Sequence, residues 1–171
     1  MRRGRSSGGS ANGPTCEAAA VGYLDVAERS WPVLNRLMGV HTWLYRNSGG
    51  RIGEHVPFVR APMLLLDHVG ARSGVHRTAA LLYVPDRDNV AIIASKGGYP
   101  QHPAWYHNVK ANPETSAQIG TERRPVRARE ATLEERERIW KRAVEVWPQY
   151  AAYQARTERQ IPIIVLERRE S

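Results

Sequence analysis

A hydroxyl, an ammonium and two glycines stand next to one another in this sequence, directly after an apolar run. The run, residues 90–94, predicts a buried strand, and Ser95 and Lys96 follow it. Gly97 and Gly98 then let the backbone adopt conformations that a Cβ would forbid. Such a set of groups at the end of a strand could hold a flat, anionic ligand at the rim of a sheet.

A short helix is predicted to follow this turn. Pro103 suits the first position of a helix, and Pro113 is a typical stop. Trp105 would then lie in the first helical turn and bring an indole close to the glycines. The alternative is an ordinary strand-to-helix connection with a buried Trp, and the physical chemistry of these residues alone favours that interpretation.

A second turn also carries groups that bind anions. Gly70 and Gly74 enclose Arg72 and Ser73, so side chains and backbone N–H groups could together form an anion-binding nest. Arg77 lies just beyond this turn and could add a second positive charge. Glycine-bounded hairpins are common, so a plain hairpin turn is the alternative.

Three motifs, in their order along the chain, resemble the central motif of the deazaflavin-dependent nitroreductase family. They are Ser95-Lys96-Gly97-Gly98, then His102-Pro103-x-Trp105-Tyr106-x-Asn108, then Ala111-Asn112-Pro113. The resemblance extends from about Trp31 to Leu166, and the glycine turn at 70–74 is similar to the family's phosphate-binding turn.

The resemblance implies an α+β fold: a split β-barrel of the FMN-binding split-barrel type, mostly antiparallel, with an N-terminal helix and C-terminal helices packed on the barrel. It also implies an oxidoreductase that transfers a hydride from reduced coenzyme F420, an 8-hydroxy-5-deazaflavin, to a quinone-like or nitroaromatic acceptor. A related split barrel that binds FMN is one alternative. A non-catalytic cofactor-binding protein or a basic nucleic-acid binder is the alternative from another class.

The resemblance assigns roles to individual residues. Cofactor binding would involve Arg72, Ser73, Gly74, Arg77, Ser95, Lys96, Gly97, His102, Pro103, Trp105 and Asn108. Acceptor binding would involve Ser95, Trp147, Tyr150 and Tyr153. Catalytic roles fall to Ser95, which would polarise the acceptor, and to Tyr150 and Tyr153, since a Tyr or solvent would return the proton. Aromatic residues spaced by three are also typical of a core-facing stripe.

The chain departs from the family's pattern at three places. Ala71 stands where the family often has a second basic residue, and Asp67-His68 stands where it has Thr-Thr. These two differences bear on how firmly the phosphate or polyglutamate tail of the cofactor is held. Trp147 replaces a Tyr that is frequent among relatives, so the substrate preference is expected to differ.

Strands are predicted where apolar residues alternate or run together. They cover residues 63–66, 76–84, 90–94, 115–120, 125–128 and 161–166. Pro162 predicts that the last strand begins at a sheet edge.

Two helices are predicted between the last two strands. Thr132 and Glu135 form a capping box that opens the first helix, and Glu134 and Arg138 are expected to pair on its outer face. Pro148 marks a break, after which a second helix is predicted over residues 149–159.

The chain of 171 residues suits one domain with a real core, and 42% of its residues are hydrophobic. Residues 1–28, rich in Gly, Ser, Ala and Arg, are predicted to be a disordered tail, and 29–171 a single domain. A helix over 31–47 is predicted to dock on the core; the alternative is an interfacial helix on a membrane. No apolar run is long enough for a membrane span or a signal peptide, so a cytoplasmic protein is expected. The single cysteine excludes an internal disulfide, and the scattered histidines suggest no metal site.

The net charge of +8 could serve nucleic acid, a membrane surface or a polyanionic cofactor, or simply keep the surface solvated. We expect a small-molecule acceptor and no nucleic-acid partner. Arg2, Arg3 and Arg5 could add a weak peripheral contact with the inner face of an anionic membrane. The sequence leaves the oligomeric state open.

Overall fold

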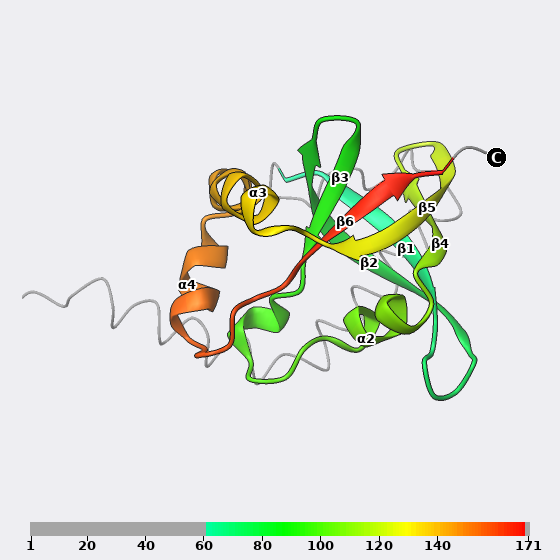
Figure 1. Ribbon diagram of the computed structural model, residues 1–171, viewed down its shortest axis with the longest axis horizontal. Coiled ribbons are helices and arrows are strands. Elements are labelled where there is room, and N and C mark those ends of the chain that lie inside the picture. Colours follow the sequence, from blue (N-terminus) through cyan, green and yellow to red (C-terminus); the bar gives the residue numbers. More distant parts are fainter. Residues whose placement is uncertain (1–60, 170–171) are drawn as a thin grey trace, which may run out of the picture. The chain divides into compact units, whose positions relative to one another are not determined.

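The computed structural model describes residues 61–169. In this part of the chain, six strands close into an antiparallel barrel in the order β1-β2-β3-β6-β5-β4, with β4 paired to β1 (Figure 1). The strands are β1 (Met63–Val69), β2 (His76–Asp86), β3 (Asn89–Ile93), β4 (Glu114–Ile119), β5 (Glu122–Glu130) and β6 (Ile163–Arg168). The helices are the short 3-10 helix η1 (Lys96–Gly98), α2 (Ala104–Ala111), α3 (Leu133–Val146) and α4 (Gln149–Ala155). The predicted antiparallel barrel with C-terminal helices is confirmed, while the tail at 1–28 and the helix at 31–47 lie outside the described residues.

The interior of the barrel is filled by alternate residues of its strands, because successive side chains of a strand point to opposite faces. It includes Leu64, Leu66, Val90, Ile92, Ile164 and Leu166, all buried. Trp105 and Tyr106 of α2 pack into the same cluster. The helix that follows η1 is therefore anchored by two aromatic side chains that belong to the barrel core.

A second core lies on the outer face of β3 and β6. Ala91, Ile93, Ile163 and Val165 pack there against Ile139 and Ala143 of α3 and Tyr150 of α4. In Figure 1, α3 and α4 lie to the left of the barrel, and α2 lies below it. Because β3 and β6 are buried on both faces, their sequences are continuous apolar runs rather than alternating ones.

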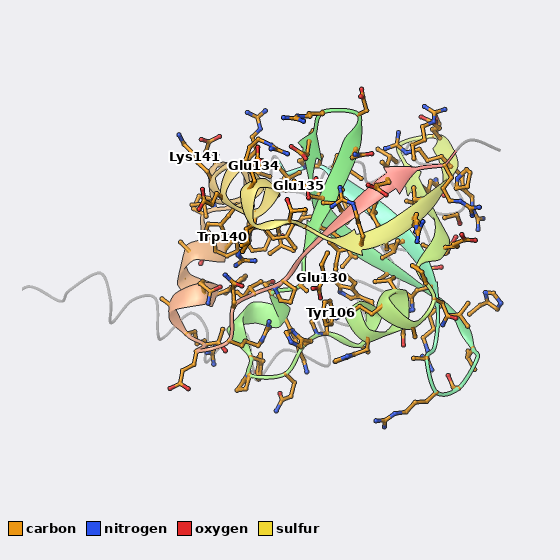
Figure 2. All side chains as sticks on the ribbon, in the orientation of Figure 1. Tyr106, Glu130, Glu134, Glu135, Trp140 and Lys141 are labelled. Carbon is orange, nitrogen blue, oxygen red and sulfur yellow. The ribbon has the colours of Figure 1, made fainter. Side chains whose placement is uncertain are left out.

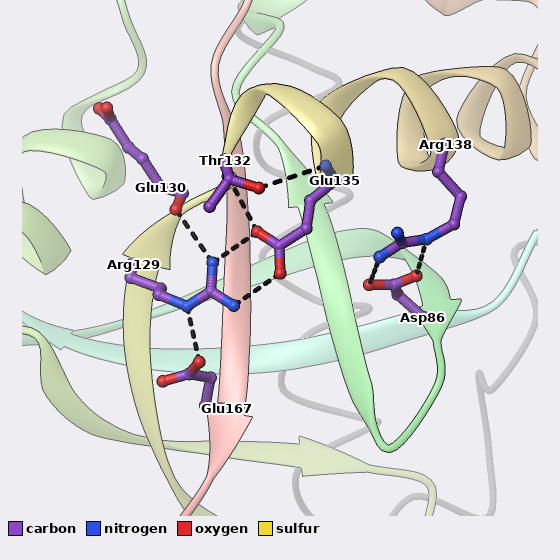
Figure 3. A network of polar contacts seen from close by, with 7 residues as sticks. All are labelled: Asp86, Arg129, Glu130, Thr132, Glu135, Arg138 and Glu167. Carbon is purple, nitrogen blue, oxygen red and sulfur yellow. Dashed lines mark hydrogen bonds and ion pairs between the residues drawn. The ribbon is translucent and has the colours of Figure 1, made fainter.

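The first turn of α3 is fixed by a polar network (Figure 3). Thr132 and Glu135 form the predicted capping box, which is confirmed. Arg129 donates from Nη1 and Nη2 to the Glu135 carboxylate at 2.7 and 2.8 Å, and from Nε to Glu167 at 2.6 Å. The hydrogen bonds from Arg129 are the main cause that lowers the pKa of Glu135 to about 2. The start of α3 is thereby tied to both β5 and β6.

Some predicted details are wrong. The Arg138 guanidinium forms a two-pronged contact with Asp86 of β2, at 2.9 Å for each bond, and Glu134 acts on it only through its charge (Figure 3). Strand β6 is not at a sheet edge, because it lies between β3 and β5 and begins after Pro162. Pro103 is the residue before the first position of α2.

Helix α4 ends at Ala155, four residues earlier than predicted. The side chain of Gln154 explains the early end, since its Nε2 donates to the carbonyl oxygens of Thr157 and Arg159. Its Oε1 accepts from the backbone N–H of Ile161 at 2.9 Å. An amide that bonds to the following backbone competes with continued helix.

Candidate functional site

The turn after β3 has an unusual backbone. Lys96, Gly97 and Gly98 have φ values of 47°, 65° and 81°, all in the left-handed region. The turn closes through hydrogen bonds from Gly98 N to Ser95 O at 3.0 Å and from Tyr99 N to Lys96 O at 3.3 Å. A residue with a Cβ pays roughly 1–2 kcal/mol in this region. Neighbouring contacts must therefore keep Lys96 in place, and the direction of its side chain is set by a strained backbone.

This turn lies directly against α4. A Cβ added to Gly98 would stand 2.6 Å from the carbonyl oxygen of Tyr153 and 3.1 Å from Cβ of Arg156. Tyr99, at the end of the turn, has the Lys96 ammonium 6.0 Å and the Arg156 guanidinium 5.4 Å from its ring centroid. The predicted cofactor turn and the helix with two of the predicted acceptor-binding residues are thus in contact.

The three aromatic residues predicted for the acceptor differ in exposure. Tyr150 is 5% exposed and belongs to the core formed by α3 and α4. Burial raises the pKa of its phenol, so Tyr150 stays protonated at physiological pH. Tyr153 lies edge-on to it at 6.2 Å and is half-buried, as is Trp147 at the end of α3. Only Trp147 and Tyr153 of the three keep substantial surface for a ligand.

A cleft of about 790 Å³ lies between the β1–β2 turn and α2. It is lined by Gly70, Ala71, Arg72, Ser73, Arg77, Ala104, His107 and Asn108. Ala104 is the first residue of α2, so the positive end of the helix dipole faces the cleft together with two guanidinium groups. The structure brings four of the predicted cofactor residues, Arg72, Ser73, Arg77 and Asn108, to one cleft, and its positive groups are of the kind that bind anions.

Asn108 is used mainly to hold the cleft together. Its Oδ1 accepts from the backbone N–H of Ala71 at 2.9 Å, and its Nδ2 lies 3.0 Å from Nδ1 of His68. Because Nδ2 can only donate, Nδ1 of His68 accepts and the ring is neutral. Burial, and then the charge of Arg77, lower the pKa of His68. Asn108 therefore fastens the turn that carries Arg72 to helix α2.

Two aromatic residues near the start of α2, Trp105 and Tyr106, are buried. Trp105 is 8% exposed in the barrel core, which matches the alternative interpretation of a buried Trp. The ring of His102, next to Pro103, lies 4.6 Å from the ring of Tyr106. The Tyr106 hydroxyl donates to Glu130 (Figure 2). The cofactor roles of His102, Pro103 and Trp105 stay predictions.

Sequence reasoning missed two residues of this region. His68 was noted only as a difference from the family pattern, and its buried bond to Asn108 joins positions 40 residues apart. Arg159 was placed inside a helix, whereas it contacts the segment from Ala94 to His102. A basic residue among 25 Lys and Arg gives no local signal for such a contact.

Within residues 61–169, no helix is long and apolar enough to cross a membrane. The same part of the chain contains no group of three or more His, Cys, Asp or Glu side chains placed to hold a metal ion.

Known proteins resemble this chain over most of its length. The family model of the F420H(2)-dependent quinone reductases matches residues 37–168. A protein of Mycobacterium tuberculosis named F420H(2)-dependent quinone reductase is 41% identical over 137 residues, which are 78% of this chain and 91% of the relative. A second protein of that organism, named putative F420H(2)-dependent quinone reductase, is 46% identical over 108 residues, 63% of this chain and 91% of the relative.

A solved structure titled F420-H2 dependent reductase aligns with a TM-score of 0.58 and 48% identity, covering 67% of this chain and all of the other. Another, titled domain-swapped dimer, has a TM-score of 0.60 and 43% identity, covering 78% of this chain and 98% of the other.

The closed antiparallel barrel with helices packed on it is the split-barrel fold of the F420-H2 dependent reductase among these solved structures. This chain belongs to the F420H(2)-dependent quinone reductase family. The predicted class of enzyme and its deazaflavin cofactor are thereby confirmed at the level of the family.

The contact between Gly98 and α4 gives a prediction for stability. Replacing Gly98 with Ala adds a Cβ that meets the Tyr153 carbonyl, so α4 or the turn must move. We expect Gly98→Ala to lower the free energy of unfolding by about 1–3 kcal/mol more than Gly74→Ala. Gly74 also has positive φ, at 65°, but nothing within 4 Å of an added Cβ, so it isolates the steric effect. Equal losses in urea unfolding of the two variants would contradict the close contact.

Proposed function

We propose that this protein transfers a hydride from reduced coenzyme F420 to a quinone. The observation that carries the proposal is the pair of anion-binding elements at the two ends of residues 95–108. One is the strained turn with Lys96, and the other is the cleft with Arg72 and Arg77. The names of the relatives support the choice of cofactor and acceptor.

The residues present fit such a cofactor. Its phosphate and polyglutamate groups are anionic, and the cleft presents Arg72, Arg77, the hydroxyl of Ser73 and the N-terminal end of α2. Lys96, Ser95 and the backbone N–H group of Gly97 would hold the polar edge of the ring system. Asn108 would act by fixing the turn that carries Arg72.

When bound, the deazaflavin supplies the hydride, so the protein needs no nucleophile or metal of its own. The side chains would orient the two reactants and exclude water, which are the contributions that hydride transfer requires. Ser95 would polarise the acceptor through its hydroxyl. Trp147 and Tyr153 would cover it, with Tyr150 packed beneath them as support. Because burial raises the pKa of Tyr150, that phenol could donate a hydrogen bond and would not ionise.

A nitroaromatic is the second acceptor class that we retain, since the aromatic side chains of Trp147 and Tyr153 could contact the ring of a quinone or of a nitroaromatic. We also retain a weak contact of Arg2, Arg3 and Arg5 with anionic lipid, which falls on residues outside 61–169. Co-sedimentation with anionic vesicles at low salt should then exceed that with neutral vesicles, and equal pelleting would remove the idea.

Cofactor choice and the anion cleft can be tested together. Fluorescence titration should show tighter binding of F420 than of FMN. Arg72→Ala should weaken F420 binding about tenfold or more, because it removes a charge-assisted hydrogen bond worth roughly 1.5–3 kcal/mol. Arg127→Ala, an exposed change on β5 outside the cleft, is the control and should bind normally. Tighter binding of FMN would instead favour the FMN-binding alternative.

The predicted role of the aromatic residues in acceptor binding can be tested at Tyr153, which is more exposed than Tyr150. Tyr153→Ala should lower the rate of quinone reduction about tenfold or more, because the acceptor loses a contact surface and water enters. F420 affinity should stay within a few-fold. Tyr153→Phe keeps the ring and removes the hydroxyl, so it separates contact from proton donation. A large drop in melting temperature, with unchanged activity per folded molecule, would place Tyr153 in the core alone.

A further inference from the structure

We infer that Arg159 is a positioning residue: its guanidinium holds the turn at residues 95–99 in the strained conformation that presents Lys96. The inference rests on the proposed function, because it assumes that this turn binds the cofactor. Arg159 lies in the connection between α4 and β6, and it reaches back across the chain to the end of β3.

Within residues 61–169, the hydrogen bonds of this guanidinium fall on one segment. Nη2 donates to the carbonyl oxygens of Ala94 and Ser95, at 3.2 and 2.8 Å. Nε donates to the carbonyl oxygen of Tyr99 at 2.9 Å. Nη1 lies 3.0 Å from Nδ1 of His102. One planar group therefore joins the residues that enter the turn to the residues that leave it.

The Ala94 carbonyl needs a donor, whereas the Ser95 carbonyl already accepts from Gly98 N at 3.0 Å and gains a second bond from Arg159. The β3–β6 ladder ends with the pair Ile93 and Ile163, so Ala94 and Ser95 lie beyond the regular strand pairing. Both residues are at least nine-tenths buried, and a buried carbonyl without a partner is costly. The guanidinium offers five N–H donors in a fixed plane, which a lysine cannot reproduce. Arg159 thus satisfies the backbone on both sides of the strained Lys96.

Arg159 is itself held in place by α4. Its carbonyl oxygen accepts from Nε2 of Gln154 at 2.9 Å, and Oε1 of Gln154 accepts from Ile161 N at 2.9 Å. The side chain of Gln154 therefore fixes the backbone on both sides of Arg159. Gln154 and Arg159 thus connect α4 to the turn through hydrogen bonds, in addition to the direct packing of Gly98 against Tyr153 of α4.

The hydrogen bond between Arg159 and His102 gives a spectroscopic readout that can be measured without the cofactor. A guanidinium has no acceptor, so Nδ1 of His102 must accept and its proton must lie on Nε2. Burial, and then the charge of Arg159, lower the pKa of His102. Loss of the Arg159 contact should therefore change both the tautomer and the titration of this ring.

The main test compares two arginine variants. Arg159→Lys should weaken F420 binding about tenfold or more in fluorescence titrations, because the charge remains but the fork is lost. Arg136→Lys is the matched control, since Arg136 of α3 also donates to a backbone carbonyl, that of Ile161, at 2.6 Å. It should lower the melting temperature while leaving F420 affinity within about twofold, because its contact lies outside the turn.

A double-mutant cycle tests whether Arg159 acts through Lys96. If Arg159 serves to place the ammonium, the loss of affinity in the Arg159→Lys, Lys96→Ala double variant should be smaller than the product of the two single losses. Multiplicative losses would show that Arg159 does not act through Lys96 and would overturn the inference. Gln154→Ala, which frees Arg159 without removing it, should weaken F420 binding in the same direction, and it replaces Arg159→Lys if that variant does not fold.

Nitrogen NMR of the ligand-free protein gives the second readout. Wild type should show His102 protonated at Nε2, and Arg159→Lys should show a mixture of tautomers because the donor to Nδ1 is lost. If wild type binds F420 while Arg159→Lys matches Arg136→Lys in affinity and leaves His102 unchanged, the inference is wrong. If wild type does not bind F420 at all, the proposed function is wrong. The role of Arg159 in cofactor binding is then wrong as well, even if Arg159→Lys changes the His102 spectrum.

Discussion

The pairing of β3 with β6 is the interaction on which the rest of this structure depends. Both strands are buried on both faces, so one side of the ladder builds the barrel interior and the other side builds the platform for α3 and α4. The strained turn begins where this ladder ends. Since burial of apolar surface is the main favourable term in folding, the two cores fix the origin of the turn far more firmly than any polar contact could.

Polar contacts then fix the loops and helix ends around the β3–β6 pair. The Arg129 network fixes the start of α3, and the amide of Asn108 fastens the β1–β2 turn to α2. Arg129 also reaches Glu167 of β6, and Asn108 reaches Ala71 and His68, so both groups join parts of the chain that are distant in sequence. Buried polar groups contribute little net energy when paired but are expensive when left unpaired, so they select one arrangement of the loops. The cleft and the turn obtain their shape from this selection.

Individual strands and the start of α3 could be predicted because they carry strong local signals, whereas the split barrel itself was implied by the family resemblance. The apolar runs at 90–94 and 161–166 and the capping box at Thr132 each depend on neighbours in the chain. Arg159 and His68 could not be found in this way, because their partners are 57–65 and 40 residues away. The end of α4 was missed for a related reason: the Gln154 side chain bonds to backbone that local propensity does not consider. The family motif identified the candidate residues, while the burial of Trp105 and Tyr150 follows only from the packed structure.

The absence of a side chain at Gly98 restricts how this scaffold can diversify. With the Tyr153 carbonyl only 2.6 Å from where a Cβ would stand, helix α4 cannot slide or tilt toward the turn, and position 98 cannot accept a larger residue without displacing the helix. Descendants of this chain could alter the surface beside the turn by exchanging side chains of α4, such as that of Tyr153. Such exchanges would change the chemistry of the surface while the spacing between α4 and the turn stays constant.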